Sequence, residues 1–288
     1  LNSSMVNLSR LIGPSLAGIL IAAAGEGFCF LVDGLSYVAV VGSLAAMRAL
    51  PAQQYSSRAG VLSELAEGWR YVVRFAPVRS ILLLLALVYL FGMQYSVLMP
   101  IFAGRILHGG AHTLGFLMAA SGVGALAGAA FLATRKSVLG LGRMLPIASA
   151  VFGAGLMGFS QSRTLALSLL LLFAAGFGMM TNMASSNTLL QTILPDERRG
   201  RVMGYYTMAF VGMMPFGSLF AGTLADRIGA PMTVLISGAL CAACGIWFAT
   251  RLKGLRKIVR PIYVELGIIR EGAQDLQSAP AVRVPHDP

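Results

Sequence analysis

The stretch Arg10–Gly18, which reads Arg-Leu-Ile-Gly-Pro-Ser-Leu-Ala-Gly, places one charge and a helix-bending Gly-Pro pair inside an apolar run. The run covers residues 6–24 and is long enough to cross a bilayer as a helix. Because Pro14 lacks a backbone N–H, a neighbouring helix or water must satisfy the carbonyl that it leaves free. The stretch therefore predicts a membrane helix that packs against another part of the protein.

A second copy of this region occurs near the other end of the chain. One constant offset aligns identical residues over two consecutive apolar runs and the turn between them. The aligned pairs are Gly13 with Gly217, Ala17 with Ala221, Gly18 with Gly222, Leu20 with Leu224, Gly25 with Gly229, Leu31 with Leu235 and Gly34 with Gly238. We interpret this pattern as an internal duplication of a helical hairpin. Parallel repeats of this kind are typical of transporters built from two similar halves.

The composition is that of a polytopic membrane protein. Apolar residues make up 57% of the chain and charged residues 11%, with a mean hydropathy of +0.76, whereas about a quarter of the residues in soluble domains are charged. The net charge of +11 would by itself also fit a protein that binds nucleic acid. The basic residues lie in the loops between apolar runs, however, so they indicate membrane topology, and no nucleic-acid partner is expected.

The apolar runs predict eight transmembrane helices and an all-α polytopic fold. The predicted spans are residues 6–24, 28–47, 80–104, 114–134, 144–161, 165–190, 202–225 and 231–250. When the loops are assigned to alternate sides, 18 of the 22 basic residues lie on one side, three lie on the other, and Arg10 lies within a span. Because cytoplasmic loops are enriched in Lys and Arg, we predict a protein of the inner or plasma membrane with both ends of this chain cytoplasmic.

The duplication pairs the first two spans with the last two, which predicts a fold of two six-helix halves. Residues 1–47 would then form the last two helices of the N-terminal half, and residues 80–251 the complete C-terminal half. Four further spans would precede Leu1, so the chain has the pattern of an N-terminally truncated twelve-span protein. We expect the full-length protein to be a monomer.

The two remaining regions are predicted to be cytoplasmic. In residues 48–79, Leu62, Leu65 and Trp69 recur at helical spacing among charged residues, which predicts an amphipathic helix that either lies along the inner membrane surface or is a solvated linker. Residues 252–288 begin with basic residues and continue with several prolines and few apolar residues. This composition predicts a basic tail that is largely disordered.

Together these features resemble the major facilitator superfamily. The Gly-Pro-x-x-Ala-Gly run of residues 13–18 resembles the antiporter motif in the fifth helix of drug:proton exporters. Three segments resemble the enterobactin-exporter-like and macrolide-efflux-like branch, namely residues 7–14, 185–191 and 195–204. One departure is Thr134, which stands where the acidic residue of a cytoplasmic loop motif is expected.

The resemblance implies a secondary active transporter, with the spans at residues 80–104 and 165–190 lining the substrate path. Uncharged polar residues in these spans are candidates for contact with a small-molecule substrate, namely Gln94, Tyr95, Thr181, Asn182, Ser185 and Asn187. The alternative is that they make hydrogen bonds between helices. The residues that the resemblance assigns to gating are Arg10, Gly13, Pro14 and Gly18.

Only two ionisable residues lie within the predicted spans, Arg10 and Asp33. Such residues are candidates for function because their burial in lipid is costly. Asp33 is a candidate for coupling to protons, which are the expected coupling ion, or it reaches the outer water. Arg10 either takes part in gating or extends to the lipid phosphates of the inner surface.

No pattern in the sequence predicts an enzyme, a cofactor or a metal site. Gly153, Gly155 and Gly158 match a dinucleotide fingerprint, but they lie within an apolar span, which favours close helix packing. Cys241 and Cys244 also lie in a span and are interpreted as packing residues. The sequence therefore favours efflux of a small amphipathic molecule, such as a drug, macrolide or siderophore-like compound, by alternating access across the lipid bilayer. The alternative is a truncated membrane subunit that does not transport or that depends on a partner.

Overall fold

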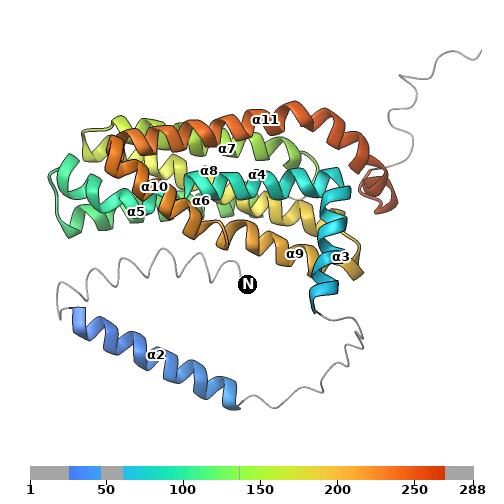
Figure 1. The fold of residues 1–288 in the computed structure, drawn as a ribbon, viewed down its shortest axis with the longest axis horizontal. Helices are drawn as coiled ribbons and strands as arrows, with labels where there is room; N and C mark the ends of the chain where they lie inside the picture. Colours follow the sequence, from blue (N-terminus) through green and yellow to red (C-terminus); the bar gives the residue numbers. More distant parts are fainter. Residues whose placement is uncertain (1–25, 47–60, 136, 270–288) are drawn as a thin grey trace, which may run out of the picture.

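The computed structural model describes residues 26–46, 61–135 and 137–269 of the 288-residue chain. Within these ranges every regular element is a helix, and six helices are long and apolar enough to cross a membrane. These six correspond to the six spans predicted between residues 80 and 250 and lie side by side in one bundle (Figure 1). The prediction of an all-α polytopic membrane protein is confirmed.

Four of the six membrane helices are continuous. They are α6 (Ala111–Ala133), α7 (Leu141–Gln161), α8 (Leu165–Ile193) and α11 (Ala230–Glu265). The other two are built from consecutive segments. One consists of α4 (Ala76–Gly92), α5 (Tyr95–Ile101) and the π-helix η1 (Phe102–Ile106), and the other of α9 (Asp196–Val211) and α10 (Met214–Ile228). The sequence predicted each of these two as one uninterrupted span, so the two interruptions are seen only in the structure.

The core of the bundle forms where α8 packs against α6 and α7, and where α11 packs against α7 and α4. Glycines allow the helices to approach closely. A Cβ atom on Gly155 would lie 2.9 Å from the backbone nitrogen of Ala175, and one on Gly128 would lie 2.8 Å from the carbonyl oxygen of Phe177. The dinucleotide-like glycines therefore serve helix packing, as predicted. Cys241 is likewise buried, with its Sγ 3.7 Å from the carbonyl oxygen of Val88.

The N-terminal region is described only in part. Helix α2 (Glu26–Ala46) coincides with the span predicted at residues 28–47 and is drawn apart from the bundle in Figure 1, with large apolar side chains such as Leu35 and Val38 exposed. The span predicted at residues 6–24 lies outside the described residues.

The amphipathic helix predicted in the linker is present as α3 (Val61–Arg74), and one of its faces packs against α9. The Trp69 and Tyr205 rings lie 5.8 Å apart between centroids, and the Arg198 guanidinium lies 4.8 Å from the centre of the Tyr71 ring. The linker helix is therefore docked on the bundle, a contact that its sequence pattern alone did not predict.

The last helix is longer than predicted. The span was expected to end at residue 250, but α11 continues to Glu265, so the prediction of a largely disordered tail is wrong for residues 252–265. Arg, Lys and Leu are good helix formers, and a hydropathy pattern does not register a helix that leaves the membrane. Gly267, with φ of 67°, ends α11, and the Gly267 and Ile268 amides donate to the carbonyls of Val264 and Tyr263, both at 2.9 Å. This arrangement is a Schellman motif.

Candidate functional site

Two membrane spans are interrupted, and the interruptions meet within the bundle. The first lies between α4 and α5 at Met93 and Gln94, and the second lies between α9 and α10 at Gly212 and Met213. Pro215 accounts for the second, because a proline in the first turn of α10 cannot continue the hydrogen bonds of α9. Irregular backbone at membrane depth is tolerated only where protein or a cavity surrounds it.

Gln94 connects the two interruptions. Its Nε2 donates to the carbonyl oxygen of Met214 at 3.4 Å, and its Oε1 accepts a hydrogen bond from the Ser218 hydroxyl at 2.9 Å. The side chain is only 2% exposed. Gly217 of α10 leaves room for it, because a Cβ atom there would overlap the Gln94 amide. One amide therefore ties the interrupted span α4–α5 to the interrupted span α9–α10.

Tyr95, the next residue, points towards other helices. Its hydroxyl shares a 2.7 Å hydrogen bond with the Ser121 hydroxyl of α6, and its ring meets the Phe152 ring of α7 edge to face with centroids 6.2 Å apart. The side chain is buried. Tyr95 thus joins α5 to α6 and α7.

Asn182 connects α8 to α7. Its Nδ2 donates to the Ser149 hydroxyl at 2.8 Å and to the Leu145 carbonyl at 3.3 Å, and the Ser149 hydroxyl donates in turn to the same carbonyl at 2.9 Å. The Asn182 side chain is fully buried. This small network holds the middle of α8 against the first half of α7.

Several buried oxygens in the middle of α8 have no hydrogen-bond partner within the described part of the chain. They are the hydroxyls of Thr181, Ser185 and Ser186 and the Oδ1 atom of Asn182. Buried polar groups are nearly always paired in folded proteins, so four unpaired oxygens within about two turns of one helix are unusual. Within the described bundle, the middle of α8 therefore holds a cluster of buried polar atoms that lack hydrogen-bond partners.

Further along α8, a polar strip is only partly covered by the described helices. Asn187 and Thr188 are half-buried and Gln191 is exposed. The Asn187 Oδ1 accepts a hydrogen bond from the Gln191 Nε2, and the Thr188 hydroxyl donates to the Ala184 carbonyl at 2.9 Å. An open polar strip on a membrane helix is suited to face water or a polar substrate rather than lipid tails.

The predicted substrate-path residues therefore do not converge on one described pocket. Gln94 contacts α10, Tyr95 contacts α6, Asn182 contacts α7, and the half-buried Asn187 belongs to the open strip of α8. Their partners Ser121, Ser149 and Ser218 were not singled out from the sequence. The available signal was that each is an isolated hydroxyl in an apolar span.

The other predicted residues lie towards the N-terminus. Asp33 is in α2, where its side chain is exposed and its backbone carbonyl accepts a 2.7 Å hydrogen bond from the Ser36 hydroxyl. The predicted gating residues lie outside the described residues, namely Arg10, Gly13, Pro14 and Gly18.

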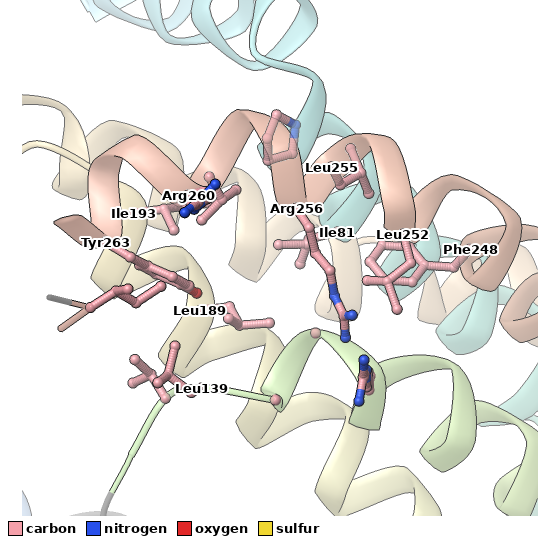
Figure 2. A pocket seen from close by; sticks show the side chains of 17 residues that line it. Ile81, Leu139, Leu189, Ile193, Phe248, Leu252, Leu255, Arg256, Arg260 and Tyr263 are labelled. Carbon is pink, nitrogen blue, oxygen red and sulfur yellow. The ribbon is translucent and has the colours of Figure 1, made fainter. Parts of the chain in front are cut away.

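A separate cavity of about 530 Å³ lies at the end of the bundle where α4 and α7 begin and α8 ends. The second half of α11 covers it (Figure 2). Apolar side chains such as Ile81, Leu189 and Leu252 line it together with the guanidinium groups of Arg143 and Arg256. From the sequence these arginines were interpreted only as topology signals.

The fold and the interrupted spans define a polytopic α-helical membrane protein. The family described as transmembrane secretion effector matches residues 1–258, and the chain belongs to that family of major facilitator transporters. The branch predicted from its motifs remains a prediction.

Three relatives indicate the same class. The chain is 24% identical to the staphyloferrin A transporter of Staphylococcus aureus over 87% of its own length and 63% of the relative. It is 28% identical to the multidrug efflux pump Tap of Mycobacterium tuberculosis over 88% of its length and 61% of the pump. It is also 28% identical to the uncharacterized MFS-type transporter YfiS of Bacillus subtilis, over 85% of its own length and 61% of that transporter. The chain thus spans about three-fifths of the length of these relatives.

Proposed function

We propose that this chain forms the last eight spans of a secondary active transporter that exports a small amphipathic molecule in exchange for protons. The similarity to a multidrug efflux pump and to a staphyloferrin A transporter supports export of a drug-like or chelator-like compound. The activity belongs to the whole transporter, because the chain spans only part of the length of these relatives.

The observation that carries the proposal is the contact between two interrupted membrane spans through Gln94. Transporters place interrupted helices at the substrate path, because a helix can bend there and its free backbone groups can bind ligands or ions. A protein with only a structural role in the membrane has no need for two such interruptions at one point.

Alternating access requires two arrangements of the helices with similar free energies. The unpaired oxygens of Thr181, Ser185 and Ser186 favour this, since groups brought to α8 by a movement of the interrupted spans would give them partners. We assign contact with substrate to the open strip around Asn187. The buried Gln94 then links the two spans that move, while Tyr95 and Asn182 tie α5 and α8 to α7.

The N-terminal spans complete the proposal. Gly13, Pro14 and Gly18 would let the first span bend and pack closely between the two halves. Arg10 would take part in gating at the inner surface, and Asp33 would carry the proton.

A second candidate is a membrane subunit that does not transport by itself. It is favoured by the uncovered apolar faces of α6 and α9–α10, where Phe116, Val123, Phe216 and Leu219 are exposed. Such faces need further helices or lipid to cover them.

The test is uptake into inverted membrane vesicles that contain the full-length transporter and carry an imposed proton gradient. Ethidium, erythromycin and enterobactin serve as separate probes. We expect gradient-dependent uptake of at least one probe, and we expect replacement of Pro14 and Gly18 together by Leu to abolish it while membrane insertion is retained. Full uptake by this variant would remove the proposed role of the first span. If correctly inserted wild-type protein moves none of the three probes, the second candidate is favoured.

A further inference from the structure

The cavity at the end of the bundle differs in character from the polar interior of α8. Most of its wall is apolar, with contributions from α4, α8 and α11 and from the loop between α6 and α7. Figure 2 shows the Phe248 and Leu252 side chains at one side of the cavity and Ile193 and Tyr263 at the other, with Arg256 between them. At about 530 Å³ it has the volume of a site for a small molecule or part of a lipid.

The charge of the cavity has one sign. Arg143, Arg256 and Arg260 contribute to its lining, and none of the described residues that line it is acidic. Within the described residues Arg143 and Arg256 have no carboxylate partner. Their guanidinium groups are planar donors that match phosphate oxygens. The cavity is therefore complementary to an anion with an apolar body.

Arg143 and Arg256 also repel each other. Arg256 lies on the part of α11 beyond the apolar segment that ends at Thr250, and burial together with the positive charge of Arg143 lowers the pKa of its guanidinium. Arginine nevertheless stays protonated at neutral pH. A bound anion would relieve this unfavourable interaction.

The position of the cavity indicates which kind of anion it would bind. Its arginines belong to the loops and helix ends that carry most of the basic residues of the chain, which is the cytoplasmic side by the positive-inside rule. A basic pocket between membrane helices on that side is the type of site that holds anionic lipid headgroups. A soluble anion would gain little from the apolar wall formed by residues such as Leu189 and Leu252.

We propose that this cavity binds an anionic phospholipid of the cytoplasmic leaflet, with the phosphate at Arg143 and Arg256 and the start of an acyl chain against α8 and α11. The site lies apart from the proposed substrate path, because its lining includes neither Gln94 nor the open strip around Asn187.

The test is native mass spectrometry of the purified full-length transporter, titrated with phosphatidylglycerol or with phosphatidylcholine of the same acyl chains. We expect replacement of Arg143 and Arg256 together by Gln to weaken phosphatidylglycerol binding about tenfold, since each basic residue near the surface adds several-fold to the affinity for anionic lipid. The matched control replaces Lys253 and Lys257 by Gln. Lys253 and Lys257 are exposed on α11, the helix that carries Arg256, and do not line the cavity. Their replacement removes the same charge as the arginine variant, so binding should change less than twofold.

Three results would overturn the proposal. Equal loss of binding in both double variants would show only non-specific attraction to surface charge, and unchanged binding in the arginine variant would exclude the cavity. Displacement of the lipid by inorganic phosphate at the same concentration would assign the site to a soluble anion. None of these measurements depends on transport, so they leave the proposed function to its own test.

Discussion

At the scale of single residues, Gln94 has the largest consequence for the bundle. It is a buried amide that makes hydrogen bonds to two groups of α10 from the other interrupted span. Its loss would remove both hydrogen bonds between the interrupted spans, although the half-buried Ser218 hydroxyl keeps its own 3.0 Å hydrogen bond to the Met214 carbonyl.

We predict that Gln94→Leu destabilises the transporter by about 1 kcal/mol, because both hydrogen bonds from Gln94 to α10 are lost while the Ser218 hydroxyl and the Met214 carbonyl stay bonded to each other. Thermal unfolding in detergent, followed by size-exclusion chromatography of heated samples, measures the change as a lowered midpoint. Gln161→Leu is the matched control, since Gln161 is exposed at the end of α7. Equal midpoints for the two variants would mean that the contact between the interrupted spans contributes nothing.

The sequence predicted most of the candidate residues but not what they contact. Gln94 and Asn182 stood out because polar side chains in an apolar span are costly unless they are satisfied. Which helix satisfies them depends on helix rotation and on neighbours such as Ser149 and Ser218, and no short-range pattern records these. The structure therefore gives Gln94 and Asn182 the hydrogen bonds between helices that stood as the alternative to substrate contact.

At the scale of helices, the six spans between residues 80 and 250 could be predicted because a membrane helix is specified by the length of its apolar run. The interruption of α9–α10 could also have been predicted, since Pro215 is visible in the sequence. The interruption at Gln94 is stabilised by contacts from distant residues, and a local pattern does not contain them. The extension of α11 was missed because it depends on helix propensity rather than hydropathy.

We predict that Pro215→Ala lowers the initial rate of probe uptake at least about fivefold while expression and insertion stay normal. Alanine restores the backbone donor and strongly favours helix, so α9 and α10 would tend to join and move Met214 away from Gln94. Pro231→Ala is the control, because Pro231 lies in the first turn of α11, where proline is tolerated. Uptake assays in inverted vesicles measure both variants. Normal uptake by Pro215→Ala would show that the interruption is not required for transport.

At the scale of the whole molecule, the described bundle is one half of the expected transporter. Its least buried membrane helices are α6 and α9–α10. These helices offer the apolar surface that a second half would cover, in agreement with a chain that spans about three-fifths of the length of its relatives.

The proposed proton coupling would be a property of this whole assembly. If Asp33 carries the proton, gradient-driven uptake by Asp33→Asn should fall at least about tenfold. The variant should still exchange labelled against unlabelled probe, because exchange needs no net proton movement. Asp226→Asn serves as the control, since Asp226 lies in the last turn of α10 beside Arg227, one of the three basic residues on the side with few positive charges, which is predicted to face outside. Full gradient-driven uptake by Asp33→Asn would assign the proton to another residue.

The glycine contacts also determine which parts of the bundle are stiff. Where Gly128, Gly155 and Gly153 bring α6, α7, α8 and α11 backbone to backbone, small changes in spacing create overlap between main-chain atoms, which cannot change rotamer to relieve it. These four helices should behave as a single stiff block. The compliant elements of the half-transporter are then the interrupted spans α4–α5 and α9–α10, so strain imposed on the bundle concentrates at the point where Gln94 links them.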